Sequence, residues 1–327
     1  MKKGYWFIIL SAFLFSTMEI VLKMVSNQFN PIQISFLRFF IGSIMLLPLA
    51  LKNLKGKKLS LNRNDYSFFI LTGFICVVVS MTFYQLAIFY CKASIVAVLF
   101  SCNPIFVVTF AFFLIGEKLY KHTIVTMVLS IIGMICILNP FNMTISLQGI
   151  IFIAISTITF ALYSVICNKK SERFGGVVLT CFSFLMGSIE MLVLMLITKI
   201  SFISQLLSDS GLKEFSNIPI LHGITLSNIP MLAYISIFVT GLGYTFYILA
   251  MEETSASTAS IVFFIKPALA PILALIILKE AITVNIMIGI AFIIIGSIIN
   301  FRGNNKLARN TINEIEDDEL KDRKSVV

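Results

Sequence analysis

The sequence predicts an all-α integral membrane protein whose ten transmembrane helices form two inverted-topology repeats of five. Composition is the first observation, since 58% of the residues are hydrophobic and only 13% are charged, with a mean hydropathy of +0.97. A soluble globule of this length would need more polar surface. The second observation is a series of long apolar segments, and the third is an internal repeat. Together they indicate a chain embedded in lipid.

Ten segments are long enough to cross a bilayer, because about 20 helical residues span roughly 30 Å of hydrocarbon. We expect them at residues 5–25, 31–51, 66–89, 93–115, 121–139, 148–167, 177–199, 230–250, 256–278 and 282–300. Most connections are short, so neighbouring spans should be antiparallel. The exceptions are the basic loop 52–65 and the segment 200–229, where we expect a short surface helix. The first segment lacks a small-residue cleavage site, which favours a retained span over a signal peptide.

Lysine and arginine are distributed unequally between the two sides that these spans define. With the N-terminus inside, that side receives the loop 52–65, the connections around 118–121 and 169–173, and the C-terminal tail. The other side receives only Lys23, Lys92, Lys199, Lys213 and Lys279. The positive-inside rule therefore places both termini in the cytoplasm, and we expect a bacterial-type inner membrane. The same bias accounts for most of the net charge of +9. The positive charge is therefore explained by membrane topology, and we expect no nucleic-acid partner.

The internal repeat relates residues 84–139 to residues 247–302 without a gap. The matched pairs are Tyr84 with Tyr247, Ala87 with Ala250, Ala93 and Ser94 with Ala256 and Ser257, Phe100 with Phe263, Pro104 with Pro267, Glu117 with Glu280, and Gly133 with Gly296. The first span similarly matches the sixth, for example through Phe15 and Phe160. Five spans per half is an odd number, so the second half should enter the membrane upside down. Such inverted repeats place a substrate site near the bilayer midplane.

This organisation divides the chain into a first repeat at 1–139, a second repeat at 140–301 and a tail at 302–327. The tail is polar and mixed in charge, and we expect it to be disordered.

Several short motifs recur in an order that is informative only as a set. They are "NPIQISFLRFF" at 30–40, "KAS" at 92–94 with "SAS" at 255–257, and "GEKL" at 116–119 with "KEAI" at 279–282. Over residues 4–301 the sequence resembles the drug/metabolite transporter superfamily, in particular its ten-span members built from two EamA domains. The resemblance implies a helical bundle with a central cavity and secondary movement of small organic solutes. The chain departs from the family pattern with Lys279 before Glu280 and Lys266 before Pro267.

Lys266 is the principal candidate for substrate binding. It lies ten residues into its span, at a depth of about 15 Å, and its repeat partner Asn103 should lie at the same level. Pro104 and Pro267 follow these residues, and each frees a backbone carbonyl, either as a plain helix kink or as part of a gate. A buried ammonium needs a partner. That partner is either an anionic group of a solute or a carboxylate of the chain, Glu190 or Glu19.

Two other intramembrane charges, Glu19 and Arg38, should both lie about 10 Å below the outer surface. We favour a structural ion pair between them, with a proton-coupling role for Glu19 as the alternative. Glu190 has no evident partner in the sequence and is a weaker candidate to line a pathway. The buried tyrosines Tyr84, Tyr163, Tyr244 and Tyr247 could orient a ligand, although ordinary packing is the commoner role.

Enzyme chemistry finds little support. His122 and His222 have no metal-ligand partner at useful spacing, the six cysteines form no C-x-x-C pair, and no phosphate-binding glycine loop is present. We therefore expect no metal and no cofactor. The sequence favours a carrier that moves a small amphipathic metabolite by alternating access, with possible proton coupling. A membrane-embedded lipid-modifying enzyme and a receptor or scaffold without transport are the alternatives.

Overall fold

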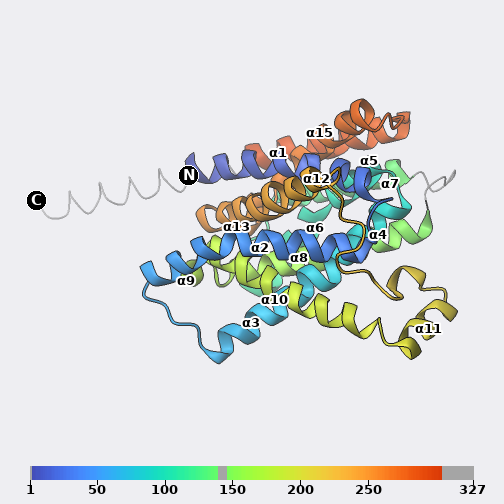
Figure 1. Ribbon diagram of the computed structural model, residues 1–327. Coiled ribbons are helices and arrows are strands. Elements are labelled where there is room, and N and C mark those ends of the chain that lie inside the picture. The colour runs from blue at the N-terminus through green and yellow to red at the C-terminus, as the bar shows by residue number, and fades with distance from the viewer. Residues whose placement is uncertain (1, 139–145, 304–327) are drawn as a thin grey trace, which may run out of the picture.

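The computed structural model describes residues 2–138 and 146–303, and within them every regular element is helical (Figure 1). The expected tail at 302–327 lies outside the described residues, except that residues 302 and 303 continue the last helix.

The first half of the chain contributes five helical segments, two of which are interrupted. In chain order the elements are α1 Lys2–Val25, α2 Pro31–Gly56, α3 Arg63–Gly73, the π-helix η1 Phe74–Met81, α4 Thr82–Tyr90, α5 Ala93–Phe100, α6 Asn103–Ile115 and α7 Lys121–Leu138. Helices α3, η1 and α4 run on as one long segment, and α5 and α6 are separated only by a turn.

The second half repeats this order with a longer insertion. Its elements are α8 Leu147–Asn168, α9 Ser171–Phe174, α10 Gly176–Ile197, α11 Ser201–Asp209, the 3₁₀ helix η2 Lys213–Phe215, α12 Ile229–Ala233, the π-helix η3 Tyr234–Gly243, α13 Tyr244–Glu253, α14 Ala256–Ala259, α15 Val262–Ile277 and a last helix, Val284–Gly303. Helix α11 is the short surface helix expected in the segment 200–229.

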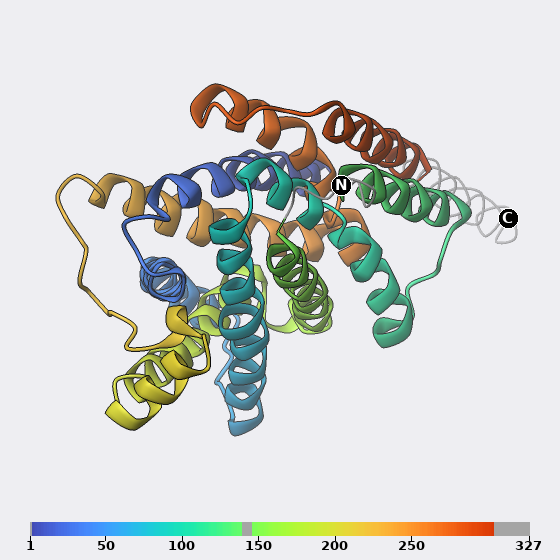
Figure 2. The same cartoon turned by 90° about the vertical axis from the view of Figure 1, so that its right-hand side faces the viewer.

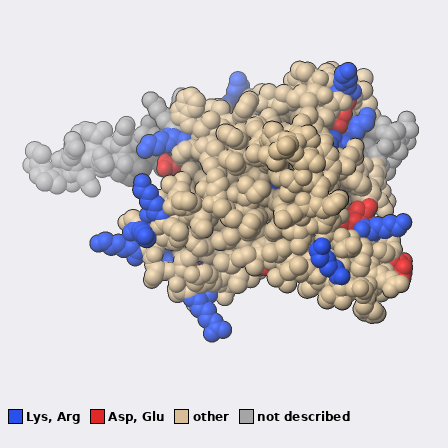
Figure 3. All heavy atoms as spheres, in the orientation of Figure 1, with Lys and Arg blue, Asp and Glu red and all other residues tan. Residues whose placement is uncertain are grey.

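Among the described residues, eight helices are long and apolar enough to cross a membrane. They are Lys3–Val25, Pro31–Gly56, Arg63–Tyr90, Ala93–Ile115, Leu147–Asn168, Gly176–Ile197, Ile229–Glu253 and Val284–Gly303. The expected spans 121–139 and 256–278 fall on α7 and on α14 with α15, which are not among the eight. Figure 3 shows lysine and arginine toward the two ends of this face, with a broad uncharged band between them. The fold is thus that of a multi-pass membrane protein, and the count of ten stays a prediction.

Local sequence signals fix where several helices begin and end. The Asn30 side chain accepts hydrogen bonds from the backbone of α2, the Gln33 side chain accepts one from the Asn30 N–H, and Pro31 occupies the first turn. This is a capping box, which satisfies backbone donors that the helix itself cannot. Helix α6 ends at Ile115, and the residue that caps it, Gly116, has a φ of +71°, which suits glycine.

Helices of each half pack against helices of the other half. Helix α1 lies against η3, α13 and α15 of the second half, and α8 lies against η1, α4 and α6 of the first half. Helices α2 and α10 contact each other, and each also contacts the π-helix of the other half. Figures 1 and 2 both show α1 running beside the C-terminal helices. The contacts are therefore reciprocal, and the core lies between the halves.

Small residues allow the closest helix approaches. A Cβ atom added to Gly73 of α3 would lie 2.5 Å from the backbone nitrogen of Gly187 in α10, and one added to Gly133 of α7 would lie 2.7 Å from the carbonyl oxygen of Gly289 in the last helix. No side chain fits in either gap, so these glycines set the distance between helices.

Candidate functional site

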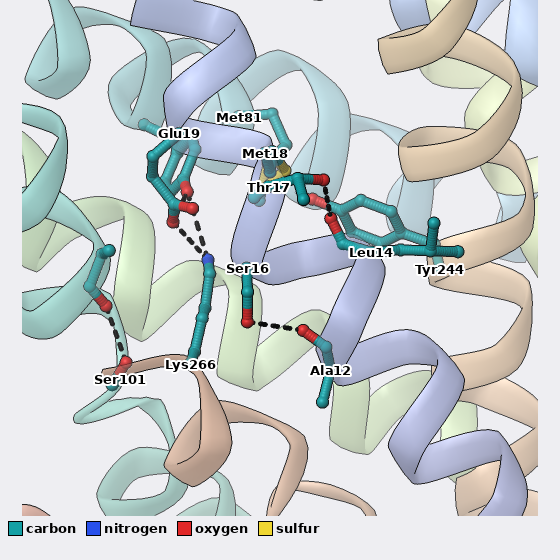
Figure 4. A network of polar contacts seen from close by, with 12 residues as sticks. Ala12, Leu14, Ser16, Thr17, Met18, Glu19, Met81, Ser101, Tyr244 and Lys266 are labelled. Atoms are coloured by element: carbon teal, nitrogen blue, oxygen red, sulfur yellow. Dashed lines mark hydrogen bonds and ion pairs between the residues drawn. The ribbon is translucent and has the colours of Figure 1, made fainter. Parts of the chain in front are cut away.

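Three polar side chains meet in the core between α1, α4 and α15. Lys266 of α15 forms an ion pair with Glu19 Oε1 of α1, and the Tyr84 hydroxyl of α4 donates to the same oxygen. Lys266 Nζ also donates to the Tyr84 hydroxyl at 3.3 Å. All three side chains are completely buried. Figure 4 shows Glu19 and Lys266 facing each other across the gap between their helices. We call these three residues the central triad.

Aromatic rings enclose the ammonium of the triad. Lys266 Nζ lies 5.0 Å from the ring centroid of Phe100, 5.6 Å from that of Tyr84 and 5.9 Å from that of Phe15. These distances suit cation–π attraction. The rings also exclude water, which strengthens the ion pair and raises the cost of losing either partner. The triad therefore joins the first half of the chain to the second at a point where an unpaired charge would be expensive.

We expected Arg38 of α2 to form an ion pair with Glu19, but it does not. Its Nη1 donates to Met18 Sδ at 3.5 Å, and its guanidinium lies 4.7 Å from the centroid of the Phe39 ring. Within the described residues, Arg38 Nε and Nη2 have no hydrogen-bond partner. The span boundaries predicted comparable depths for Glu19 and Arg38. It could not show that α15 would bring Lys266 to the carboxylate instead.

Asn103 and Lys266, which are equivalent in the repeat, make equivalent contacts between helices. Asn103 Nδ2 of α6 donates to the carbonyl of Thr157 in α8 at 3.0 Å, just as Lys266 of α15 reaches Glu19 in α1. The Asn103 contact is a neutral hydrogen bond that ties two helices together. Pro104 and Pro267 follow the two residues, at the start of α6 and inside α15 respectively.

The remaining tyrosine candidates lie in one buried aromatic cluster next to the triad. The Phe160 ring centroid is 5.8 Å from that of Tyr163, 5.7 Å from Tyr244 and 5.9 Å from Tyr247. The Tyr244 hydroxyl donates to Met81 Sδ at 3.0 Å. These contacts are well-packed ring pairs of the kind that stabilise a core.

Glu190 is separate from this core. It lies on α10 and is partly exposed, and among the described residues its Oε2 has no hydrogen-bond partner. Lys266 is paired with Glu19 and not with Glu190.

Two glutamates that sequence reasoning treated only as motif residues make reciprocal contacts at opposite ends of the bundle. Glu280, after α15, accepts from Ala93 N at 2.9 Å, from Ser94 N at 3.1 Å and from Ser94 Oγ at 2.6 Å. Glu117, after α6, accepts from Ser257 Oγ of α14. Both pairs are equivalent in the sequence repeat, and that equivalence was the signal available in the sequence. We call the two contacts the Glu280 clasp and the Glu117 clasp.

The surroundings of the two clasps differ. Near the Glu280 clasp, Lys23 Nζ donates to the carbonyls of Ile88 and Cys91 at 2.8 and 2.9 Å, and burial raises the pKa of the Cys91 thiol, an effect that Lys23 partly opposes. The Glu117 clasp borders two pockets, of about 300 Å³ and about 350 Å³, which both reach Ser255 as well. The helices at the end with the Glu280 clasp are therefore joined by several hydrogen bonds, whereas the end with the Glu117 clasp contains two pockets.

Comparisons with known proteins agree with this architecture. A transporter from Clostridium kluyveri, named "Uncharacterized transporter", is 44% identical over 94% of this chain and 95% of its own. The Bacillus subtilis "Uncharacterized transporter YoaV" is 22% identical over 86% of this chain and 90% of its own. A solved crystal structure shares the fold, with a TM-score of 0.69 and 16% identity over 94% of this chain and 99% of that one.

The family model for the EamA-like transporter family matches residues 2–139 and again residues 147–302. The two matches cover both halves of the chain, including every residue of the central triad and both clasps. The chain therefore belongs to the EamA-like transporter family.

Proposed function

We propose that this chain is a ten-span secondary transporter that moves a small organic metabolite across the cytoplasmic membrane by alternating access, through export or exchange. The metabolite is amino-acid-like or otherwise amphipathic. The observation that carries the proposal is the central triad, because its ion pair joins α1 of the first half to α15 of the second half. A charge pair buried in the core of a membrane protein is costly to keep, and a structural contact alone would not require it.

The reciprocal packing of the halves supports an inverted repeat. Each half contributes its first helix to the other half's third and fourth segments, which is the arrangement expected when two equivalent units of opposite orientation share one core. In transporters built this way, one unit rocks against the other around a site near the midplane. The central triad occupies such a shared position.

The unequal clasps support a state closed on one side only. By the positive-inside prediction, the Glu280 clasp lies on the outer side and the Glu117 clasp on the cytoplasmic side. The outer clasp has three hydrogen bonds and lies near the bonds of Lys23 to Ile88 and Cys91, whereas the cytoplasmic clasp has one bond and borders open pockets. Alternating access would weaken the first clasp as it completes the second.

The solute would pass the polar and aromatic groups of the core. We propose that the pathway includes Lys266, Asn103, Tyr84, Tyr163, Tyr244 and Tyr247, with Glu190 nearer its edge. Glu19 is the candidate for proton coupling, since a proton on its carboxylate would remove the charge that holds both Lys266 and Tyr84 to α1. Pro104 and Pro267 would let α6 and α15 bend during the change.

The direct test is a screen followed by flux. Purified protein would be screened for thermal stabilisation by a pool of metabolites, and each stabilising compound would then be assayed for movement into proteoliposomes. Flux that depends on the protein supports the proposal. Binding without flux would favour a receptor, and turnover of the vesicle lipids would favour a lipid-modifying enzyme.

A further inference from the structure

We infer that Arg38 is the residue that receives the carboxylate of a monoanionic solute, an inference that rests on the proposed transport function. The starting point is a charge imbalance. Arg38, Lys266 and Glu19 are all completely buried, so two cations share one anion. Since Lys266 and Glu19 already form an ion pair, the uncompensated charge is that of Arg38.

The hydrogen bonds of Arg38 show which edge of its guanidinium is free. Nη1 is turned toward Met18 Sδ, while Nε and Nη2 have no partner within the described residues. These two nitrogens lie on the same side of the planar group, and their N–H bonds point in parallel. The free edge is thus a complete fork of two donors, which is the geometry that binds both oxygens of one carboxylate.

The chain itself offers no second carboxylate for this fork in the described core. The groups close enough to influence Arg38 electrostatically are Tyr244, Tyr84, Cys76 and Glu19. The first three are neutral side chains. Glu19 binds Lys266 and Tyr84 through Oε1, and although its Oε2 also lacks a hydrogen-bond partner within the described residues, Glu19 forms neither an ion pair nor a hydrogen bond with Arg38 there. A guanidinium does not lose its proton in a protein. A buried ion of this kind is normally retained only where something pairs with it.

The surroundings of the fork indicate what the rest of the solute should be. The Phe39 ring under the guanidinium lies 4.7 Å from Phe184 and 5.8 Å from Tyr244, measured between ring centroids. An apolar or aromatic body would pack against these rings. One carboxylate also matches the single surplus charge. A phosphate dianion would need a second cation, and Lys266 is already engaged by Glu19.

The first test measures binding. Wild-type protein and Arg38→Gln would be titrated with simple aromatic and aliphatic monocarboxylates and with their uncharged amides, with thermal stabilisation as the readout. We expect wild type to prefer at least one acid over its amide by roughly ten- to hundredfold. Arg38→Gln should lose that preference, Arg38→Lys should keep part of it, and the surface control Arg173→Gln should match wild type.

Stability without any solute gives an independent readout. Removing an unpaired buried charge is neutral or stabilising, so Arg38→Met without solute should melt at or above the wild-type temperature. A clear drop in melting temperature, or failure to fold, would overturn the inference, because it would mean that Arg38 has a structural partner. Equal acid preference in wild type and Arg38→Gln, or a wild type that prefers only amides, would overturn it as well.

These outcomes separate the inference from the proposed function. Flux in proteoliposomes without any Arg38-dependent preference for acids would support the proposed transport function and overturn the role of Arg38. Arg38-dependent binding of acids without flux would support the carboxylate site and overturn the proposed transport function.

Discussion

At the scale of single residues, the three completely buried charges of the described core divide into two classes. Lys266 and Glu19 neutralise each other with the help of Tyr84, whereas two donors of Arg38 have no hydrogen-bond partner within the described residues. The distinction matters because a paired buried charge contributes to stability only through its partner, while an unpaired one is available to a ligand. Lys266, which depth alone favoured as the anion contact, is in the first class.

The ion pair predicts strong coupling between its two members. Lys266→Met would leave Glu19 buried without a counter-charge, so we expect a loss of about 3–5 kcal/mol in the free energy of unfolding. The double variant Lys266→Met/Glu19→Gln should recover much of that loss. The control is Arg173→Met, which removes the charge opposite Asp65. That arginine is 37% exposed although its partner is only 4% exposed, so its loss should cost less than the loss of Lys266, whose pair is completely buried. Additive effects of the two core substitutions would show that the ion pair does not matter.

Proton coupling predicts a specific loss in Glu19→Gln. The variant cannot release a proton, so flux driven by a pH gradient should stop while solute binding and exchange at equal pH continue. The measurement is uptake into proteoliposomes with and without the gradient. If Glu19 is only structural, the ratio of driven to undriven flux should stay unchanged. A lower melting temperature is expected in both cases, because Glu19→Gln leaves Lys266 buried without a counter-charge.

At the scale of helices, the clasps connect the end of one broken segment to the start of its counterpart. Glu280 satisfies two free N–H groups at the start of α5, as a capping carboxylate does. Glu117 contacts only the hydroxyl of Ser257 at the start of α14. The interrupted segments and the π-helices η1 and η3 supply places where the chain can bend, because their backbone ladders are irregular.

Neutralising the clasps should therefore have unequal effects. Glu280→Gln loses charge-assisted bonds to two backbone donors and a hydroxyl, so it should lower the melting temperature more than Glu117→Gln. The matched controls are Ser94→Ala and Ser257→Ala, which each remove only the hydroxyl that donates to the glutamate. They should lower the melting temperature less, and by more similar amounts. Equal destabilisation by the two glutamate variants would contradict the proposal that the outer side is the closed one.

At the scale of the whole molecule, the sequence predicted the helical segments well because hydropathy and capping signals are local. The segment expected at 31–51 starts at Pro31 as predicted, and the helix continues beyond the expected end to Gly56. The Glu19–Lys266 pair could not be predicted, since depth in the membrane says nothing about which way a side chain faces. The π-helices could not be predicted from the sequence either, because they arise from tertiary packing.

Topology is the whole-molecule prediction that follows from the positive charges. Reporter fusions after Asn62 and after Asn304 should both report the cytoplasm, and a fusion near Ser210 should report the outside. A cytoplasmic signal near Ser210 would contradict the inverted repeat, because that repeat requires the two halves to enter the membrane in opposite orientations.

The central claim is that one core site faces the two sides of the membrane in turn, and exchange in proteoliposomes tests it most directly. Vesicles would be loaded with unlabelled solute identified by the binding screen, and entry of the labelled solute would be followed. The account predicts that internal solute accelerates uptake, and that Lys266→Met, checked for folding by its size-exclusion profile, reduces this exchange. Uptake that is indifferent to internal solute, or binding with no uptake at all, would contradict it.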